Sequence, residues 1–243
     1  NNAIFAGVDI LDAVTMMPIN STSKTFTSLN TANFSEDFTI PAGTTKSVYL
    51  AGNMAASLLS YAGQIPSLSL KSVALKGSAA VIGSLPIIGN YQTVNGNIVI
   101  GSATVQRGAY SNASTTTSAP TEVGKTDFGV FSFQVAAGST EDVTFSQVRV
   151  YQSGSASLST DLDNIKLYQD GTLLASGVVS GSYIDFTFTP ITLLKGQTKQ
   201  FVVKADIIGG SARTVKLAIY RSTDLLVKGL TYGYNITPTY SGT

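Results

Sequence analysis

Apolar and polar residues alternate along much of the chain, most regularly after residue 125. The apolar residues of these rows fall in residues 131–135, 184–188, 201–207, 215–219 and 230–236. A period of two predicts β-strands with one face in a core and the other in solvent. Within residues 143–151 the apolar parity switches between Phe145 and Val148, which predicts a bulge near Ser146. The pattern predicts an all-β chain built of antiparallel β-sandwiches, either immunoglobulin-like or jelly-roll-like.

Two dipeptides between apolar rows predict two-residue hairpin turns. Asp170-Gly171 would join residues 164–169 to 172–179, and Asn95-Gly96 would join 91–94 to 97–100. Both dipeptides tolerate the positive φ angles that such turns need. The one candidate helix is residues 53–61, and the glycines beside it favour a loop almost as strongly.

A polar stretch divides the chain. Residues 111–118 read Ser-Asn-Ala-Ser-Thr-Thr-Thr-Ser, and glycines lie on either side at Gly108 and Gly124. We expect residues 1–110 to form a first sandwich, 111–124 an exposed Ser/Thr-rich linker, and 125–243 a second sandwich. Each half has enough residues to bury a core of its own.

The two halves also resemble each other. The segment from Gly43 to Leu50 matches the segment from Gly196 to Val203, 153 positions later. Only 42 residues precede Gly43, and counterparts of residues 131–135 and 143–151 are missing from them. We therefore expect the first sandwich to be incomplete and to be finished by a strand from a neighbouring copy. The shortness of this half is equally consistent with a smaller first domain, or with missing strands that belong to an earlier part of a precursor.

Two segments are candidate assembly strands. The first is N-terminal, where one apolar row comprises Ile4, Ala6, Val8 and Ile10. The second is the C-terminal segment 230–240. Repeated head to tail, a donated strand would give an open homopolymer of the chain.

Several segments together resemble a known kind of repeat. They are Asp-Asn-Ile-Lys-Leu-Tyr at 163–168, Asp170-Gly171, Phe-Thr-Phe at 186–188 and Gly-Gln-Thr-Lys-Gln-Phe-Val-Val-Lys-Ala-Asp at 196–206. This succession resembles the immunoglobulin-like repeats of bacterial and archaeal surface-layer and fibre proteins, over residues 125–237 and part of the first half. The resemblance implies an exported structural protein.

Composition narrows the functional classes. Charged residues make up 12% of the chain, about half the usual share. The net charge of +1 offers no electrostatic footprint for nucleic acid, and no apolar run is long enough for membrane insertion. Histidine and cysteine are absent, which excludes His- and Cys-based nucleophile pairs and the ordinary zinc, copper and haem sites. We expect no enzymatic activity and no cofactor, with calcium as the one exception to consider.

Carboxylates are the remaining candidates for chemistry. Glu36-Asp37 and Glu141-Asp142 are adjacent pairs whose members point to opposite faces of a strand, and we interpret both as solvated loop charges. Asp161, Asp163 and Asp170 offer oxygen ligands for calcium, but turn capping is the more common role of such residues.

Four Asn-x-Ser/Thr motifs are candidate glycosylation sites: Asn20, Asn33, Asn112 and Asn235. Asn112 lies in the expected linker. The function we expect is an extracellular structural subunit of a surface layer or filament, with copies of itself as partner and glycans as a further possible partner. The alternative is a surface adhesin or carbohydrate-binding module, with Tyr61, Tyr91 and Tyr110 as the aromatic platform. A carboxylate hydrolase ranks far behind both.

Overall fold

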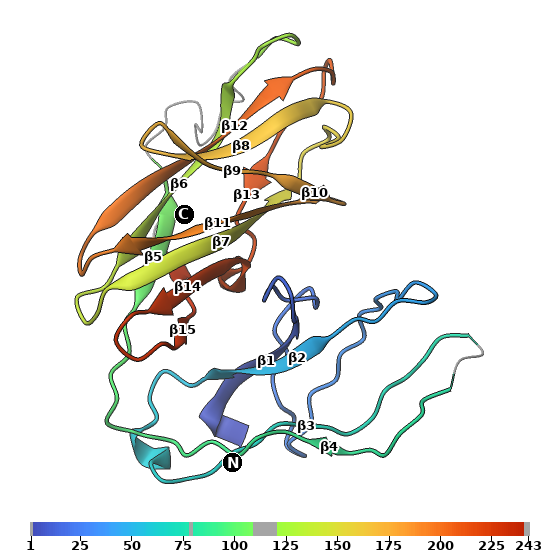
Figure 1. The fold of residues 1–243 in the computed structure, drawn as a ribbon, viewed down its shortest axis with the longest axis vertical. Helices are drawn as coiled ribbons and strands as arrows, with labels where there is room; N and C mark the ends of the chain where they lie inside the picture. Colours follow the sequence, from blue (N-terminus) through green and yellow to red (C-terminus); the bar gives the residue numbers. More distant parts are fainter. Residues whose placement is uncertain (1, 78–79, 109–120, 241–243) are drawn as a thin grey trace. The chain divides into compact units, whose positions relative to one another are not determined.

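A computed structural model describes residues 2–77, 80–108 and 121–240 of the chain. It divides into two compact units, Asn1–Ile98 and Val99–Thr243 (Figure 1). Within the described ranges the regular structure is β, with short 3-10 turns at η1 (Asn2–Ile4), η2 (Leu59–Tyr61) and η4 (Ser222–Asp224). In those ranges we find no helix with the length and apolar character needed to cross a bilayer. The all-β prediction is confirmed.

Two six-stranded sheets make up the second unit. The first has the order β16-β5-β6-β12-β8-β9. Its strands are β5 (Ala103–Arg107), β6 (Phe128–Ala137), β8 (Leu162–Gln169), β9 (Thr172–Ser176), β12 (Thr198–Ile207) and β16 (Thr239–Tyr240). Neighbours pair antiparallel except β16, which pairs parallel to β5.

The second sheet has the order β10-β11-β7-β14-β15, with β13 also paired to β7. Its strands are β7 (Val143–Gln152), β10 (Val178–Ser180), β11 (Tyr183–Leu193), β13 (Leu217–Ala218), β14 (Leu225–Gly229) and β15 (Asn235–Ile236). β7 is the central strand, because β11 lies along one edge while β13 and β14 share the other.

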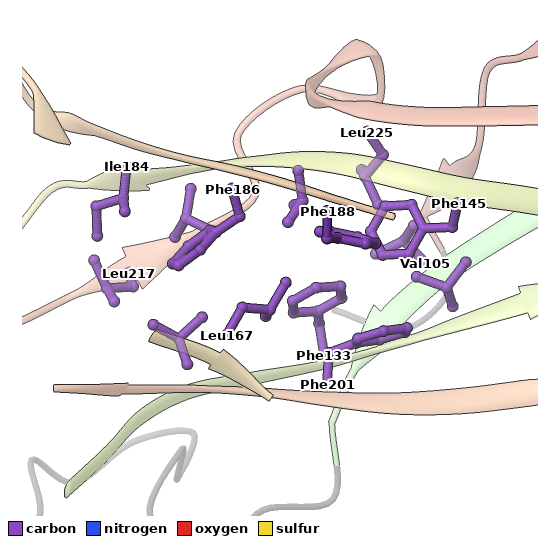
Figure 2. Close-up of a cluster of buried hydrophobic side chains, with 14 of the residues drawn as sticks. Val105, Phe133, Phe145, Leu167, Ile184, Phe186, Phe188, Phe201, Leu217 and Leu225 are labelled. Carbon is purple, nitrogen blue, oxygen red and sulfur yellow. The ribbon is translucent and has the colours of Figure 1, made fainter. Parts of the chain in front are cut away.

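The two sheets face each other across one hydrophobic core (Figure 2). Phe133 and Phe201 stack on the first sheet with ring centroids 5.1 Å apart. Phe145, from the second sheet, meets the Phe201 ring edge-on at 5.2 Å. All three rings are fully buried, as the alternating rows of β6, β7 and β12 require. Truncating one such ring to alanine costs about 3–5 kcal/mol.

Two local predictions for this unit are confirmed. Gln147 lies opposite Leu226 while Phe145 lies opposite Val227, so Ser146 is the extra residue of a bulge in β7. The bulge returns both Phe145 and Val148 to the core. The Asp170-Gly171 turn joins β8 to β9, and both of its residues have positive φ, at 49° and 82°.

The division between the units falls earlier than the sequence suggested. We expected a linker at 111–124, whereas the structure places the boundary between Ile98 and Val99. The reason is β5, which pairs with β6 over five residues and buries Ala103 and Val105 in the second unit's core. Most of the expected linker, residues 109–120, lies outside the described residues.

The first unit does not form the expected sandwich in its described ranges, 2–77 and 80–98. Its strands pair as two separate ladders, β1 (Phe5–Asp12) with β2 (Val48–Met54) and β3 (Ser69–Leu70) with β4 (Ile87–Ile88). Its buried apolar side chains in those ranges are few: Ile4, Val8, Met17, Pro18 and Val94. Its structure is therefore that of a partial fold with little core.

Three smaller predictions are wrong. Residues 91–100 form no strand pair around Asn95-Gly96, and the Asn95 side chain instead accepts a hydrogen bond from the amide of Asn97. The candidate helix at 53–61 is a strand end followed by η2. The row at 230–236 is mostly a turn, because the pairing edge of β7 is occupied by β14, and Leu230, Tyr232 and Tyr234 are exposed.

Candidate functional site

The strongest candidate site is the open edge of β2 in the first unit. β2 pairs with β1 alone among the described residues. Its counterpart in the second unit is β12, which is hydrogen-bonded on both edges, by β8 and by β6. An unpaired strand edge leaves a row of backbone donors and acceptors without strand partners, which is the usual template for strand addition.

The equivalence of β2 and β12 rests on matching register. Val48 lies opposite Asp12 and Met54 opposite Phe5, while Phe201 lies opposite Gln169 and Ile207 opposite Leu162. These pairs are related by a shift of 153 residues on one strand and 157 on the other. The same two shifts hold at both ends of the ladder. The β1–β2 ladder therefore repeats the β8–β12 ladder.

The turn before each strand repeats as well. The amide of Thr44 donates to the carbonyl of Pro41 over 3.1 Å, and the amide of Gln197 donates to the carbonyl of Leu194 over 2.8 Å. Within these turns Gly43 and Gly196 have φ angles of 75° and 71°, a region that favours glycine. The internal repeat that the sequence suggested thus has a structural counterpart.

Burial differs sharply between the two copies. Phe201 and Val203 of β12 are fully buried. Their counterparts in β2 are Val48, which is 40% exposed, and Leu50, which is half-buried. The last residue, Met54, is 43% exposed, whereas its counterpart Ile207 is buried. The inward row of β2 therefore lacks the cover that the facing sheet gives β12.

The segment before β2 shows the same deficit. In the second unit, β11 precedes the turn and pairs with β7, burying Leu193. In the first unit the residues just before the turn form no strand, and Phe38 and Ile40 are exposed. A counterpart of β7 is missing from the described ladders of this unit. Without it, this segment has nothing to pair with.

The predicted assembly strand is β1 together with η1, and the structure already uses both of its edges. β2 lies along one edge, and on the other Val8 exchanges backbone hydrogen bonds with Lys24 at 2.8 and 3.0 Å. Ile4 and Val8 are buried, Ile10 is half-buried and Ala6 is exposed. Exchange of β1 between copies would restore these contacts, but it would leave the second edge of β2 open.

A buried polar cluster fixes β1 in place. The carboxylate of Asp9 accepts hydrogen bonds from Asn20 at 2.7 Å, Ser23 at 2.6 Å and Asn53 at 2.8 Å. Asn20 in turn accepts a 2.7 Å hydrogen bond from the amide of Ile10. A buried carboxylate is tolerated only when it is well hydrogen-bonded, so this cluster ties β1, β2 and residues 20–23 together.

The calcium candidates do not come together. Asp161 is buried and binds the guanidinium of Arg213 at 2.8 Å and the amide of Ser157 at 2.7 Å. Asp163 and Asp170 are exposed near opposite ends of β8, about 20 Å apart at the usual rise per residue. Among the described residues no cluster of three acidic side chains is placed to hold a metal. The described arrangement therefore does not gather Asp161, Asp163 and Asp170 around one point.

Glu141 was interpreted as a solvated loop charge, and this is corrected by the structure. Its side chain is buried and accepts hydrogen bonds from the amide of Gly101 at 2.6 Å and the amide of Thr231 at 2.8 Å. Burial works against the charged form, but these hydrogen bonds outweigh it and hold the pKa of Glu141 below 4.5. Glu141 is thus a structural clamp between chain segments 130 residues apart.

The other acidic pair, in the first unit, makes surface ion pairs. Glu36 lies 2.8 Å from Lys24, and Asp37 pairs with the exposed Lys76. Partial burial works to raise the pKa of Glu36, but hydrogen bonds from Lys24 and Ser21 outweigh it and lower the pKa to about 2. Neither acidic pair forms the two facing carboxylates that glycoside hydrolysis needs.

The glycosylation candidates separate by exposure. Asn20 is 1% exposed and its side-chain amide is engaged with Asp9, so the folded chain does not present it to an enzyme. Asn33 and Asn235 are exposed. Asn112 lies outside the described residues.

The structure brings together three tyrosines that the sequence did not group. Tyr151 of β7 lies 5.0 Å from Tyr183 of β11 and 5.4 Å from Tyr220, measured between ring centroids. Beside them Arg149 lies 5.4 Å from the Tyr183 ring and makes a two-point ion pair with Asp185, at 2.6 and 3.2 Å. Burial raises the pKa of Tyr183. We call Tyr151, Tyr183 and Tyr220 the tyrosine cluster.

The tyrosines expected to form a platform are placed differently. Tyr61 ends η2 and is half-buried, Tyr91 is exposed, and Tyr110 lies outside the described residues. No aromatic contact joins Tyr61 to Tyr91 among the described ring pairs. The tyrosine cluster was missed because its members come from two strands and the loop between β13 and η4, although Tyr151 and Tyr183 fall on the outward parity of their rows.

Comparison with known proteins gives little to transfer. No family model matches the chain, and no curated protein matches it. Among solved structures, a DUF4466 family protein from Parabacteroides merdae is similar at 16% identity and a TM-score of 0.24. The match covers 57% of this chain and 45% of that protein's length.

Proposed function

We propose that this protein is a structural subunit of a cell-surface layer or extracellular filament, assembled from repeated β-units by strand addition. In this proposal the second unit is a complete immunoglobulin-like sandwich, and the first unit is an incomplete copy of it. The observation that carries the proposal is the open edge of β2, whose counterpart β12 has both edges paired.

Strand addition follows from the energetics of that edge. Exposed strand edges attract other strands, and natural proteins block them with charges, prolines or bulges. Residues 48–54 contain neither charge nor proline, and the apolar side chains of Val48 and Met54 are exposed along them. A contact of this kind is heterologous, so repeating it extends an open polymer unless the rotation closes a ring.

Composition supports the same proposal. A surface with only 12% charged residues has little of the electrostatic repulsion that keeps soluble proteins apart. The absence of histidine and cysteine removes the residues on which most nucleophilic catalysis depends. Extracellular location, self-association and a non-enzymatic role form one consistent proposal, in which glycans at Asn33 or Asn235 are optional.

Electron microscopy of the purified full chain in negative stain tests this function. We expect filaments or sheets in which the spacing between successive subunits is no greater than the length of one folded chain. A chain that stays monomeric at millimolar concentration and across salt conditions would contradict self-assembly.

The tyrosine cluster favours a second candidate, a glycan-binding surface module. Tyrosine combines a flat apolar ring with a polar hydroxyl, which suits it to binding surfaces that are partly wet, and Tyr220 is 58% exposed. Binding on a glycan array that is lost in Tyr220→Ala and kept in Tyr91→Ala would support it. Tyr91 is a suitable control because it is 66% exposed and lies in the other unit.

A further inference from the structure

We infer that the tyrosine cluster is an oxidation site at which the rings of Tyr151 and Tyr183 become joined by a covalent carbon–carbon bond. The oxidant is a peroxide, acting through a peroxidase that removes one electron at a time from a phenol. This inference goes beyond both proposed functions and depends neither on assembly nor on glycan binding. It is carried by the positions of three rings in the second unit.

Tyr151 and Tyr183 lie directly opposite each other on β7 and β11. At the next position along the ladder, the amide of Gln152 donates to the carbonyl of Ser182 over 2.8 Å. Hydrogen-bonded and non-hydrogen-bonded pairs alternate along an antiparallel ladder, so Tyr151 and Tyr183 form a non-hydrogen-bonded pair, whose side chains come closest together. Their ring centroids are 5.0 Å apart and their planes are inclined by 46°. The two strands therefore hold the rings against each other before any reaction.

This arrangement is selective within the chain. The sequence has 11 tyrosines, and among the ring pairs of the described residues the contacts of tyrosine with tyrosine both belong to the cluster. Cysteine and tryptophan are absent, so an oxidising equivalent that reaches the chain ends on a tyrosine or on one of three methionines. Methionine is oxidised by gaining an oxygen atom, whereas phenols lose single electrons, so a peroxidase acts on the tyrosines.

Tyr220 is the point of entry for the oxidant. Its side chain is 58% exposed, whereas Tyr151 and Tyr183 are half-buried. The Tyr220 ring lies 5.4 Å from the Tyr151 ring, so Tyr151 contacts both of the other rings. A radical formed on Tyr220 can take an electron and a proton from a neighbouring phenol and thereby pass inward. Tyr220 lies in the loop between β13 and η4, so the coupled pair is the one that two paired strands hold together.

The reaction balances with one molecule of hydrogen peroxide for each link. Each phenol loses one electron and its hydroxyl proton and becomes a phenoxyl radical. The two radicals join at ring carbons next to the oxygen-bearing carbons, and the hydrogens of those carbons move to the oxygens and restore both phenols. The peroxide takes up the two electrons and two protons and becomes two molecules of water.

Oxidation of the full chain at low micromolar concentration, with a haem peroxidase and hydrogen peroxide, tests the inference. The monomer is isolated and digested, and linked peptides are identified by mass spectrometry, with fragmentation to locate the joined residues. A link is two hydrogen atoms lighter than the sum of its two peptides. We expect the link between Tyr151 and Tyr183 to be about tenfold more abundant than any other, because groups held in contact react faster than groups that must meet by diffusion.

Variants that keep the ring but remove the phenol separate the roles of the three residues. Tyr151→Phe and Tyr183→Phe should each abolish the link, while Tyr220→Phe should slow its formation and leave its position unchanged. Tyr91→Phe is the matched control, at a 66% exposed tyrosine of the other unit, and it should couple as the native chain does. The urea midpoint of each variant before oxidation shows that its second unit is folded. In the native chain that midpoint should rise after oxidation, because the link closes the loop of residues 152–182 as a disulfide would.

Three results would overturn the inference. The first is the absence of any link at an oxidant dose that already converts the methionines to sulfoxide, which shows that oxidant reached the chain. The second is a dominant link from Tyr151 to Tyr220 instead of to Tyr183. The third is a yield that rises with protein concentration, because the link would then join different copies. None of these results bears on whether the chain forms filaments.

Discussion

The side-chain amide of Asn20 donates a 2.7 Å hydrogen bond to the carboxylate of Asp9, and both residues are almost completely buried. Asn20 also accepts from the amide of Ile10, so one side chain serves both the buried charge and the backbone of β1. The pair thus fixes β1 through hydrogen bonds in a unit that has few buried apolar side chains.

Replacing Asn20 by alanine should therefore destabilise the first unit by about 2 kcal/mol, because it leaves a buried carboxylate with fewer donors and a strand amide without its acceptor. Hydrogen exchange of residues 5–12 measures the effect. The Asn33→Ala variant, at an exposed asparagine of the same unit, should exchange as the native chain does. Equal protection in both variants would show that the cluster around Asp9 is not needed.

Acid should weaken the second unit through Glu141. Its folded pKa lies below its unfolded value of 4.5, so its contribution to stability is complete above pH 4.5 and is lost as the pH falls through the folded pKa. Glu141→Gln, which turns one acceptor into a donor facing a backbone amide, should lower stability at pH 7 by about 2 kcal/mol. The gap to the native chain should narrow below pH 4.5.

Urea unfolding of the second unit at a series of pH values measures that gap. Glu122→Gln is the control, because Glu122 is exposed in the same unit. A gap that stays constant down to pH 2 would contradict the role given to the Glu141 charge.

A charge on the open edge should block assembly. Val48→Lys places an ammonium group where strand addition would bury it, and lysine on an edge strand is a natural barrier to pairing. We expect polymers to disappear in light scattering and microscopy while the second unit keeps its unfolding midpoint. Val178→Lys is the matched control, since Val178 is an exposed valine on the edge strand β10 of the other unit. Loss of polymers in both variants would mean that net charge, rather than the β2 edge, controls assembly.

A cut between Thr116 and Thr117 should not release the first unit. A specific protease site inserted there would leave β5 on the N-terminal fragment, but β5 is held by β6 and by the Glu141 bond to Gly101. The two fragments should elute together from a sizing column and separate in urea. The Val105→Asp variant should separate after the cut without urea, because it puts a charge in the core. Fragments of the native sequence that part at once would contradict the place of β5.

The sequence predicted the second unit well, for a physical reason. Strands such as β6, β11 and β12 bury alternate side chains on one face, so their period of two is visible in the residues themselves. The bulge at Ser146 was predicted because a change of parity has no other regular solution. Asp170-Gly171 was predicted because few residue pairs accept two positive φ angles.

Features that depend on distant partners were not predicted. β5 has only two buried apolar side chains, Ala103 and Val105. Two apolar residues are too few to distinguish a short strand from a loop in the sequence, and the strand is evident only from its pairing with β6. Asn95-Gly96 has the residue types that favour a hairpin turn, but the residues on either side of it do not pair as strands. Glu141 looks like a surface charge in the sequence, because the amides that it binds lie 40 and 90 positions away. The open edge of β2 was anticipated only through the repeat.

The parallel contact of β16 with β5 bears on when the second unit can fold. Thr239 pairs with Thr104, and the amide of Thr231 donates to Glu141, so strands made late in this unit complete one made early. Contacts so remote in sequence slow folding, because a long loop must close before they form. During synthesis the apolar faces of β5 and β6 therefore stay exposed until the later strands are made. In that interval, pairing with a strand of a neighbouring nascent chain competes with formation of the native sheets.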